Sequence, residues 1–571
     1  MALARAQTAD HTLTLSTCID KYVYANNARL YTCFVDFAKA FDTVCRDALL
    51  YKIWQLGVKG KFFNCLEYMY KHSTAKIKLL NRLSEKIEVM VGTEQGHPMS
   101  PELFKCYIHG LSEDLNNLED CDTPILGDVE ISHLLWADDI VLLALNPESL
   151  QRLIDVLMQY CSDWGLTVNL SKTAVMIFNR SGRQLKESHC FTFGDVNIQS
   201  TKEYCYLGII FTLTGSFRKA QQHLRQKGMR SYFSLKRKLD FRAIKQNTIF
   251  KLYDSPIVPV ATYGCQLWAY ELNLFKEAFL NNNNQDASLS MLAKDPAEIL
   301  HLSFMKSNLG VGRKTSNITI WRDSGRVPVA IKLLKQIFGY LKRLVELVQS
   351  GSTSLVALAF KEQVNLKLKW HEGMSRLYYA ATNRNLTNDE KISPIDIQQK
   401  ISLLFNTRWN KERHLNRKLE FYNRIKPEFG FEKYLYEGIR YKEVSCLARF
   451  RMSAHKLRIE TGRYHINRHS QVNRACEECS DVKIAEDLNE LPFYRPIIED
   501  ELHVLKVCPK YHDIRCQLGE SLKTNLFADI ASAFCDTRGI AQFIRKIMNR
   551  RFPQEAHPKK KEAKRKEKSE E

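Results

Sequence analysis

Short apolar runs that contain single acidic residues mark the first part of the chain. One run covers residues 31–37 and includes Asp36, and a later stretch, 134–143, carries the pair Asp138 and Asp139 between two apolar halves. Apolar runs of this length, bounded by turns, are typical of buried strands. The pattern predicts one strand that ends near Asp36, and a strand-turn-strand unit with the aspartate pair at its turn.

Two stretches near these runs carry apolar residues at helical spacing. The first follows a Gly- and Pro-rich turn, and we predict a helix with Ser100 as its N-cap, Pro101 at its first position and a buried face made of Leu103, Tyr107, Leu111, Leu115 and Leu118. The second is predicted to start at a cap on Ser149 and to end near Gly165. Strand, helix, strand-turn-strand and helix in this order predict an α+β domain with carboxylates at one edge of its sheet.

Carboxylates at the ends of buried strands are costly unless they are paired or hold a metal ion. Mg²⁺ favours one or two carboxylates together with substrate phosphates, and two such ions can clamp an in-line phosphoryl transfer. An Asp-Asp pair alone is most often a hairpin turn, and a strand-end aspartate is most often a cap or a surface charge. The further segments that lie between and after the aspartates change this balance.

These segments resemble the motifs of reverse transcriptases from non-LTR (LINE-like, jockey-type) retrotransposons. The matching segments, in order, are 34–44 (FVDFAKAFDTV), 95–101 (QGHPMSP), 136–139 (WADD), 165–169 (GLTVN) with Lys172-Thr173, and 206–208 (YLG). Similarity continues through Tyr263-Gly264 with Trp268, Gly325-Arg326 with Pro328, and a Cys/His cluster. The resemblance implies an α+β right-hand polymerase palm, an antiparallel sheet with helices, followed by a helical thumb.

The resemblance also implies an activity and its cofactors. It implies an RNA-directed DNA polymerase, a nucleotidyltransferase of a transposable element that uses Mg²⁺ or Mn²⁺, an RNA template, a DNA primer and deoxynucleoside triphosphates. Carried over to this chain, Asp36 and Asp138 become the magnesium ligands, and Asp139 an auxiliary catalytic carboxylate. The ordinary alternatives, a turn and a cap, apply to each residue taken alone.

Further positions follow from the same resemblance. Phe41 would sit under the sugar of the incoming nucleotide, where a 2′-hydroxyl distinguishes RNA from DNA precursors. Gln95 and Gly96 would contact nucleotide and template, and Lys172 would supply positive charge, or a proton, to the departing pyrophosphate. The tripeptide Tyr206, Leu207 and Gly208 would form the primer grip. The alternatives are a core phenylalanine, an ordinary turn, a surface lysine and a common strand-turn tripeptide.

The region before Asp36 departs from the family pattern. Residues 1–35 predict one helix, whereas the family places the strands and basic residues of the fingers there. We therefore expect an amino-terminally truncated domain with incomplete fingers, without the endonuclease, and with weakened nucleotide affinity. Glu94 and His97 also differ from the residues usual at their positions.

Composition favours a nucleic-acid partner. The chain of 571 residues has 84 Lys and Arg against 64 Asp and Glu, a formal net charge of +20. A basic stretch, 218–238, follows the last motif and suits a thumb that tracks phosphates, although charge runs are usually solvated faces. Sixteen cysteines in a chain without a signal peptide predict an intracellular protein, in nucleus and cytoplasm. No apolar run is long enough to predict a membrane span, and oligomeric state is not readable.

A second Cys/His pattern lies near the carboxyl end. Cys476 and Cys479 form one close pair, and His503 and Cys508 form another. Four such ligands make a closed tetrahedral zinc site, which has a structural rather than a catalytic role. Unrelated buried cysteines are the alternative, and His512 and Cys516 are spare candidates for ligands.

The whole pattern predicts five parts: a palm with incomplete fingers (1–212), a thumb-like helical region (213–280), a helical carboxyl-terminal region (285–470), a Cys/His zinc module (471–520), and a terminal helix with a disordered basic tail (521–571). Two alternatives to an active polymerase stay open. One is a catalytically inactive retroelement remnant, and the other is a host-recruited RNA-binding protein.

Overall fold

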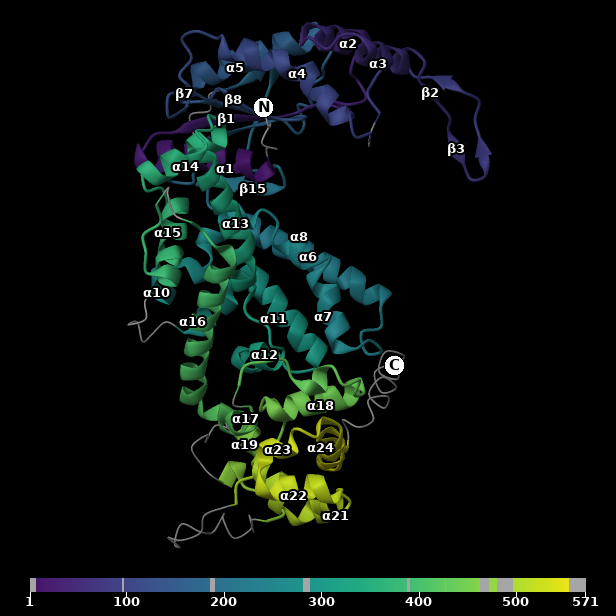
Figure 1. The fold of residues 1–571 in the computed structure, drawn as a ribbon, viewed down its shortest axis with the longest axis vertical. Helices are drawn as coiled ribbons and strands as arrows, with labels where there is room; N and C mark the ends of the chain where they lie inside the picture. The colour runs from purple at the N-terminus through teal and green to yellow at the C-terminus, as the bar shows by residue number, and fades with distance from the viewer. Residues whose placement is uncertain are drawn as a thin grey trace, which may run out of the picture.

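The amino-terminal α/β part and the carboxyl-terminal Cys/His part lie at opposite ends of an elongated molecule, with a helical region between them (Figure 1). The computed structural model describes residues 7–94, 97–184, 190–280, 288–387, 391–426, 428–462, 472–479 and 497–553.

A five-stranded sheet organises the amino-terminal part. Its order is β13 (Gln199–Ser200), β10 (Ala174–Phe178), β1 (Leu30–Asp36), β9 (Asp139–Ala144) and β8 (His133–Trp136). All neighbouring strands are antiparallel except β10 and β13. The α+β organisation, predicted from the order of strands and helices, is confirmed, and so is the antiparallel sheet that the family resemblance implied.

Side chains of the central strand β1 alternate between two cores, because successive residues of a strand point to opposite faces. Cys33 and Val35 pack with the helices α2 (Arg46–Gln55), α4 (Ser100–Asn116) and α5 (Pro147–Trp164) on one face. Phe34 packs on the other face, where α1 (Thr8–Cys18) and the hairpin of β14 (Glu203–Tyr206) and β15 (Ile209–Thr212) lie. The strand is therefore buried on both sides up to its last residue.

The predicted helix starts need correction, although both helices exist. Ser100 is the first residue of α4 rather than its cap, because its hydroxyl donates to the Glu94 carbonyl. At α5 the cap is Asn146, whose Oδ1 accepts the Ser149 amide at 2.7 Å. The predicted end at Gly165 is correct, with φ 66° in the left-handed region. Before β1 the chain forms α1 and a π-helical segment, Ile19–Ala25.

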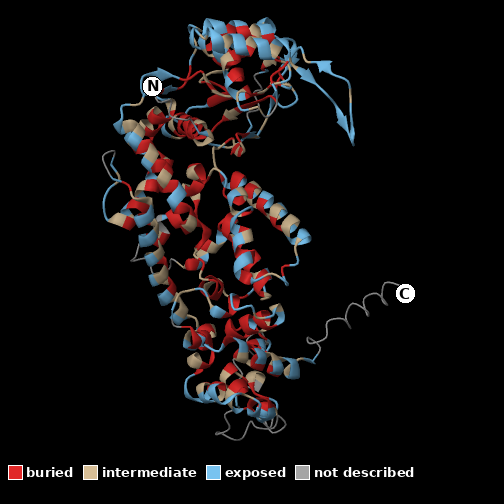
Figure 2. Cartoon of the chain, turned by 45° about the vertical axis from the view of Figure 1, so that its right-hand side comes forward, coloured by how far each residue is buried: buried red, intermediate tan, exposed pale blue. Residues whose placement is uncertain are grey.

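A two-stranded ribbon projects from the end of α3 (Lys61–Lys71) and is exposed along its length (Figure 2). It pairs β2 (Thr74–Ala75) with β5 (Ile87–Glu88), and β3 (Lys78–Leu79) with β4 (Arg82–Leu83). Two further short hairpins are β6 (Ile125–Leu126) with β7 (Val129–Glu130), and β11 (Thr192–Phe193) with β12 (Val196–Asn197).

Helices form the remainder of the described chain. They are α6 (Arg218–Lys238), α7 (Gln246–Asp254), α8 (Val258–Ala261), α9 (Cys265–Trp268), α10 (Glu277–Leu280), α11 (Pro296–Leu309), α12 (Asn317–Asp323), α13 (Val329–Gln349), α14 (Leu355–Asn365), α15 (Lys369–Thr382), α16 (Pro394–Leu415), α17 (Glu420–Ile425), α18 (Tyr441–Arg451), α19 (Arg458–Thr461), α21 (His512–Cys516), α22 (Glu520–Ala528), α23 (Ile530–Ala533) and α24 (Thr537–Arg551).

One apolar core runs from the lower face of the sheet into these helices. The long helix α13 lies against α14 and α16, and its Ile331, Leu334 and Phe338 are fully buried, as their helical spacing predicts. α1 packs on α14, and its Asp10 accepts a hydrogen bond from Tyr340 of α13 at 2.9 Å. These contacts fix the sheet on the helical region.

Residues 281–287, which include the boundary predicted between the thumb-like and carboxyl-terminal helical regions, and residues 554–571, which include the end of the predicted basic tail, lie outside the described residues. Among the described residues, none of the helices combines the length and the apolar content needed to cross a lipid bilayer.

Candidate active site and metal centre

Three carboxylates meet where β1 ends and β9 begins. Asp36 and Asp139 are register partners in this antiparallel pair, and Asp138 precedes Asp139 in the turn that connects β8 to β9. The turn is tight, because Trp136 and Asp139 are themselves paired, and Ala137 takes φ 52° to close it. Pairing of β1 with β9 thus brings together carboxylates that are far apart in sequence.

The carboxylates hold one another in a partly buried, negative environment. Burial, together with the charges of Asp138 and Asp36, raises the pKa of Asp139 to about 6. Oδ2 of Asp36 is buried and accepts no hydrogen bond from the described residues, although Lys172 Nζ lies 3.3 Å away as an ion-pair partner. A site of this kind favours a cation, since one lysine does not balance three carboxylates.

The segment after α5 supports Asp36 and presents Lys172. Val168 bridges to Phe37, and the Asn169 amide donates to the Asp36 carbonyl at 2.7 Å. The Thr173 hydroxyl accepts the Asp36 amide at 3.2 Å. The end of β1 is therefore held by backbone contacts on the side from which Lys172 approaches.

Phe41 is half-buried and packs on Phe104 of α4, with ring centroids 5.1 Å apart. The segment that leads to the predicted nucleotide-contacting turn runs beside it, because the Thr93 amide donates to the Phe41 carbonyl at 2.7 Å. Gln95 and Gly96 themselves lie outside the described residues. The structure thus brings the neighbours of these two residues to Phe41.

The tripeptide 206–208 forms the tip of the β14–β15 hairpin. Leu207 (φ 46°) and Gly208 (φ 81°) are its two turn residues, and Tyr206 is buried. Two residues earlier on the same strand, the Tyr204 ring stacks on Phe34 of β1 with centroids 4.4 Å apart. Sequence reasoning missed Tyr204, although the two-residue period of a strand places it on the same face as Tyr206.

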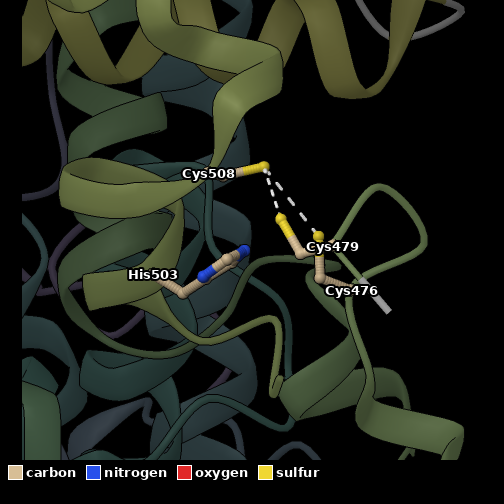
Figure 3. A group of neighbouring side chains, drawn as sticks. All are labelled: Cys476, Cys479, His503 and Cys508. Atoms are coloured by element: carbon tan, nitrogen blue, oxygen red, sulfur yellow. Dashed lines mark hydrogen bonds between the residues drawn. The ribbon is translucent and has the colours of Figure 1, made fainter. Parts of the chain in front are cut away.

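Cys476, Cys479, His503 and Cys508 gather at the far end of the molecule (Figure 3). One ligand atom from each lies within 4.8 Å of the others, and Sγ of Cys508 is 3.9 Å from both other sulfurs. Nε2 of His503 is buried without a hydrogen-bond partner among the described residues. The four predicted ligands therefore come together in an arrangement that could hold a metal ion.

Local contacts build this cluster from two separate segments. The Cys476 amide donates to the Ile497 carbonyl at 2.8 Å, and the His503 amide donates to Asp500 Oδ1 at 2.7 Å. The spare candidates His512 and Cys516 contact each other on α21, at 3.5 Å, and are not members of the cluster.

The thiols differ in acidity. Burial opposes ionisation of Cys476, but the His503 imidazole, the Glu478 backbone and the Cys479 thiol together outweigh it and lower the pKa of the Cys476 thiol to about 7. Burial and the two neighbouring sulfurs raise the pKa of Cys479 to about 12. Crowding of thiolates is thus unfavourable in the protein alone, and a bound cation relieves it.

Comparisons with known proteins agree with this geometry. Residues 5–211 match the sequence profile of the family described as reverse transcriptase (RNA-dependent DNA polymerase). This match includes the residues before Asp36 and all three carboxylates.

The curated relatives include Pol polyproteins and a polymerase of mobile elements. A Pol polyprotein from the type-1 retrotransposable element R2 of Nasonia vitripennis is 28% identical over 214 residues, which cover 36% of this chain and 20% of that protein. The RNA-directed DNA polymerase from mobile element jockey of Drosophila funebris is 23% identical over 261 residues, covering 44% and 26%. The chain matches 20% of the length of the R2 relatives from Nasonia vitripennis and Drosophila melanogaster.

Among solved structures, telomerase from Candida albicans bound to a fragment of telomeric RNA aligns with 55% of this chain and 52% of its own, at 12% identity and a TM-score of 0.29. A score this low adds nothing to the assignment, which stands on the family profile and the mobile-element relatives. Residues 5–211 are a reverse transcriptase domain, similar to the polymerases of the R2 and jockey mobile elements.

Proposed function

We propose that the chain is an RNA-directed DNA polymerase that extends a primer 3′-hydroxyl along an RNA template. The observation that carries this proposal is the meeting of Asp36, Asp138 and Asp139 at the adjoining ends of β1 and β9. In this proposal the sheet and its covering helices are the palm, and the deoxynucleoside triphosphate lies above the three carboxylates.

The chemistry of the site fits divalent metal ions, Mg²⁺ or Mn²⁺. Asp36 offers a buried oxygen that accepts no hydrogen bond from the described residues, and Asp139 is a carboxylate whose ionisation is disfavoured without a nearby cation. We assign Asp36 and Asp138 as the ligands and Asp139 as their auxiliary. When bound, such ions neutralise charge on the transferring phosphoryl group and on the departing pyrophosphate.

Other side chains then have roles that follow from their positions. Lys172 is largely exposed and contacts Asp36 only at its tip, so that it is free to reach the pyrophosphate. Phe41, supported from below by Phe104, is placed to exclude a 2′-hydroxyl. The Tyr206–Gly208 turn is proposed to contact the primer end, and Gln95 and Gly96 the nucleotide and template.

The helix α6 is proposed as the thumb surface that tracks the nucleic acid. Its exposed basic residues are Arg218, Lys219, Lys227, Arg230, Lys236, Arg237 and Lys238, whereas Leu224 and Tyr232 face the core. A helix with cations on one side and apolar residues on the other suits contact with phosphates, which supply most of the sequence-independent affinity.

The Cys/His cluster is proposed to hold structural Zn²⁺. Three sulfurs and one imidazole nitrogen match the ligand types of closed zinc sites, which leave no position for a catalytic water. The free cysteines of the chain and its mobile-element relatives support action inside the cell, in nucleus or cytoplasm.

Primer extension on an RNA template with deoxynucleotides and Mg²⁺ tests the function. We expect synthesis by the unchanged chain and none by Asp36→Asn, which keeps the size of the side chain and removes its charge. Asp128→Asn, in the exposed β6–β7 turn, is the matched control and should keep full activity. Nucleic-acid binding without synthesis under all metal conditions would instead support an inactive remnant or an RNA-binding protein.

A further inference from the structure

The tip of the β14–β15 hairpin is held from outside by one tyrosine. The Tyr263 hydroxyl donates to the Leu207 carbonyl at 3.2 Å. The same ring lies against the next residue, since a Cβ added to Gly208 would meet Tyr263 Cε1 at 2.9 Å. Tyr263 thus contacts both turn residues, one through its hydroxyl and the other through its ring edge.

Tyr263 is itself fixed at the corner between α8 and α9. The buried Trp268 donates its indole N–H to the Tyr263 carbonyl at 2.9 Å. Gly264 takes φ 63°, and a Cβ there would lie 2.7 Å from Ile209 Cδ1, so the absence of a side chain lets the corner approach the first residue of β15 closely. The position of the hairpin tip is therefore determined by contacts with the helical region as well as with the sheet.

The hairpin tip borders a cavity on the side where Tyr263 lies. A cavity of about 440 Å³ lies among α1, the hairpin, α8 and α13, and both Leu207 and Tyr263 line it. Packing around the turn is therefore incomplete on this side, although Leu207 itself is buried. The hydrogen bond from Tyr263 restrains the Leu207 backbone here, in addition to the Tyr206–Ile209 pairing that closes the turn.

The hairpin also reaches the carboxylates. Tyr204 stacks on Phe34, which lies two residues before Asp36 on β1. Burial and the negative charge of Asp139 both raise the pKa of Tyr206, which shows that the strand end lies within electrostatic reach of the site. A shift of the hairpin tip would therefore move a molecule bound at the tip closer to the carboxylates or farther from them.

We propose that Tyr263 is a positioning residue that fixes the Leu207–Gly208 turn, and through it the primer 3′ end, relative to Asp36, Asp138 and Asp139. This inference rests on the proposed function, because it takes the turn as the primer contact. Tyr263 touches neither nucleotide nor metal ligand in this scheme. Its hydroxyl acts only through the backbone of the turn.

Tyr263→Phe is the variant that tests this role, because it removes the hydroxyl and keeps the ring. Loss of one hydrogen bond corresponds to about a fivefold effect, and we expect the KM for primer-template to rise by about fivefold while the KM for deoxynucleotide stays the same. Amide hydrogen exchange of residues 203–212 should accelerate by a similar factor. Thr262→Val is the matched control, since its hydroxyl donates only within its own helix, to the Val258 carbonyl at 2.7 Å.

An unchanged primer-template KM together with unchanged hairpin exchange in Tyr263→Phe would overturn the proposal. A lowered unfolding midpoint with both KM values raised equally would also overturn it, because that pattern marks a merely structural residue. If even the unchanged chain fails to extend primers, the proposed polymerase function fails. Primer-template affinity by fluorescence anisotropy and hairpin exchange then still decide whether Tyr263 positions the turn.

Discussion

Asp36, the last residue of β1, and Asp139, the first residue of β9, stand opposite each other as register partners. Antiparallel pairing places such side chains on the same face about 5 Å apart, and like charges directly opposite destabilise a sheet. The raised pKa of Asp139, caused by burial and by the charges of Asp138 and Asp36, is the visible result. Such an arrangement is unfavourable unless a cation binds to the concentrated negative charge.

The two aspartates of the turn should differ in importance. Asp138→Ala removes a proposed metal ligand and should abolish primer extension, as Asp36→Ala should. Asp139→Ala removes only the auxiliary carboxylate and should leave trace activity. Extension assays at matched enzyme and Mg²⁺ concentrations distinguish the three variants, and robust synthesis by Asp36→Ala or Asp138→Ala would contradict the ligand assignment.

Phe41 should set the preference for deoxynucleotides. Replacing it with valine opens space beside the supporting ring of Phe104, so that a 2′-hydroxyl fits. We expect incorporation of ribonucleotides relative to deoxynucleotides to rise by about tenfold or more, a size typical of a removed steric contact. Phe63→Val, on α3, is the control. An unchanged ratio in Phe41→Val would show that Phe41 is only a packing residue.

The Cys/His cluster should bind about one zinc ion per chain. Cys479→Ser combined with His503→Ala should remove it, and metal analysis of the purified protein measures the loss. His512→Ala is the matched control, because His512 contacts Cys516 on α21 rather than the cluster. Full zinc content in the double variant would show that the ligands are assigned wrongly.

Binding of RNA or of an RNA–DNA duplex should weaken steeply with added salt, because contacts to phosphates release counterions. Changing Lys227 and Arg230 on the exposed face of α6 to glutamine should flatten the plot of log affinity against log salt. The control changes Lys76 and Lys78, on the exposed ribbon, to glutamine and so removes the same number of charges. Affinity that does not depend on salt would point to a protein partner instead.

The local periods of the sequence were enough to predict the central strand, the strand-turn-strand unit and the helices around Tyr107 and Leu153. They were enough because a short continuous apolar run is typical of a strand buried on both faces, as β1 is, and because the buried helix faces follow a period of 3.6 residues. Helix caps were harder to predict. Ser100, the predicted cap, donates its hydroxyl to the Glu94 carbonyl instead, and Met99 occupies the cap position.

Long-range polar contacts could not be predicted from the sequence. Asp10 pairs with Arg343, and Asp323 pairs with Arg451, across separations that no local pattern encodes. Such pairs depend on how complete helices dock, which in turn depends on the whole core. For the same reason the contact between Tyr263 and the Leu207 carbonyl was not predictable, although both segments were recognised as motifs.

The pair Asp323–Arg451 gives a last prediction, which concerns stability. Both side chains are almost fully buried, and Asp323 also accepts hydrogen bonds from Tyr422 and Tyr434 at 2.8 Å each. Asp323→Ala removes the Asp323 acceptor from both tyrosine hydroxyls, of which that of Tyr422 keeps the Thr319 carbonyl at 3.5 Å. It also leaves Arg451 with Glu432 as its remaining carboxylate partner. Breaking a buried pair in this way costs about 3–5 kcal/mol.

Urea unfolding followed by tryptophan fluorescence measures this loss as a lower midpoint, because Trp321 and Trp409 are buried in the same helical region. Asp513→Ala is the matched control: it breaks the exposed pair with Arg550, where solvent screens the charges, and should leave the midpoint unchanged. A midpoint in Asp323→Ala equal to that of the unchanged chain would show that the tyrosines and Glu432 compensate for the lost carboxylate. The helical region would then owe its stability to apolar packing rather than to this buried polar network.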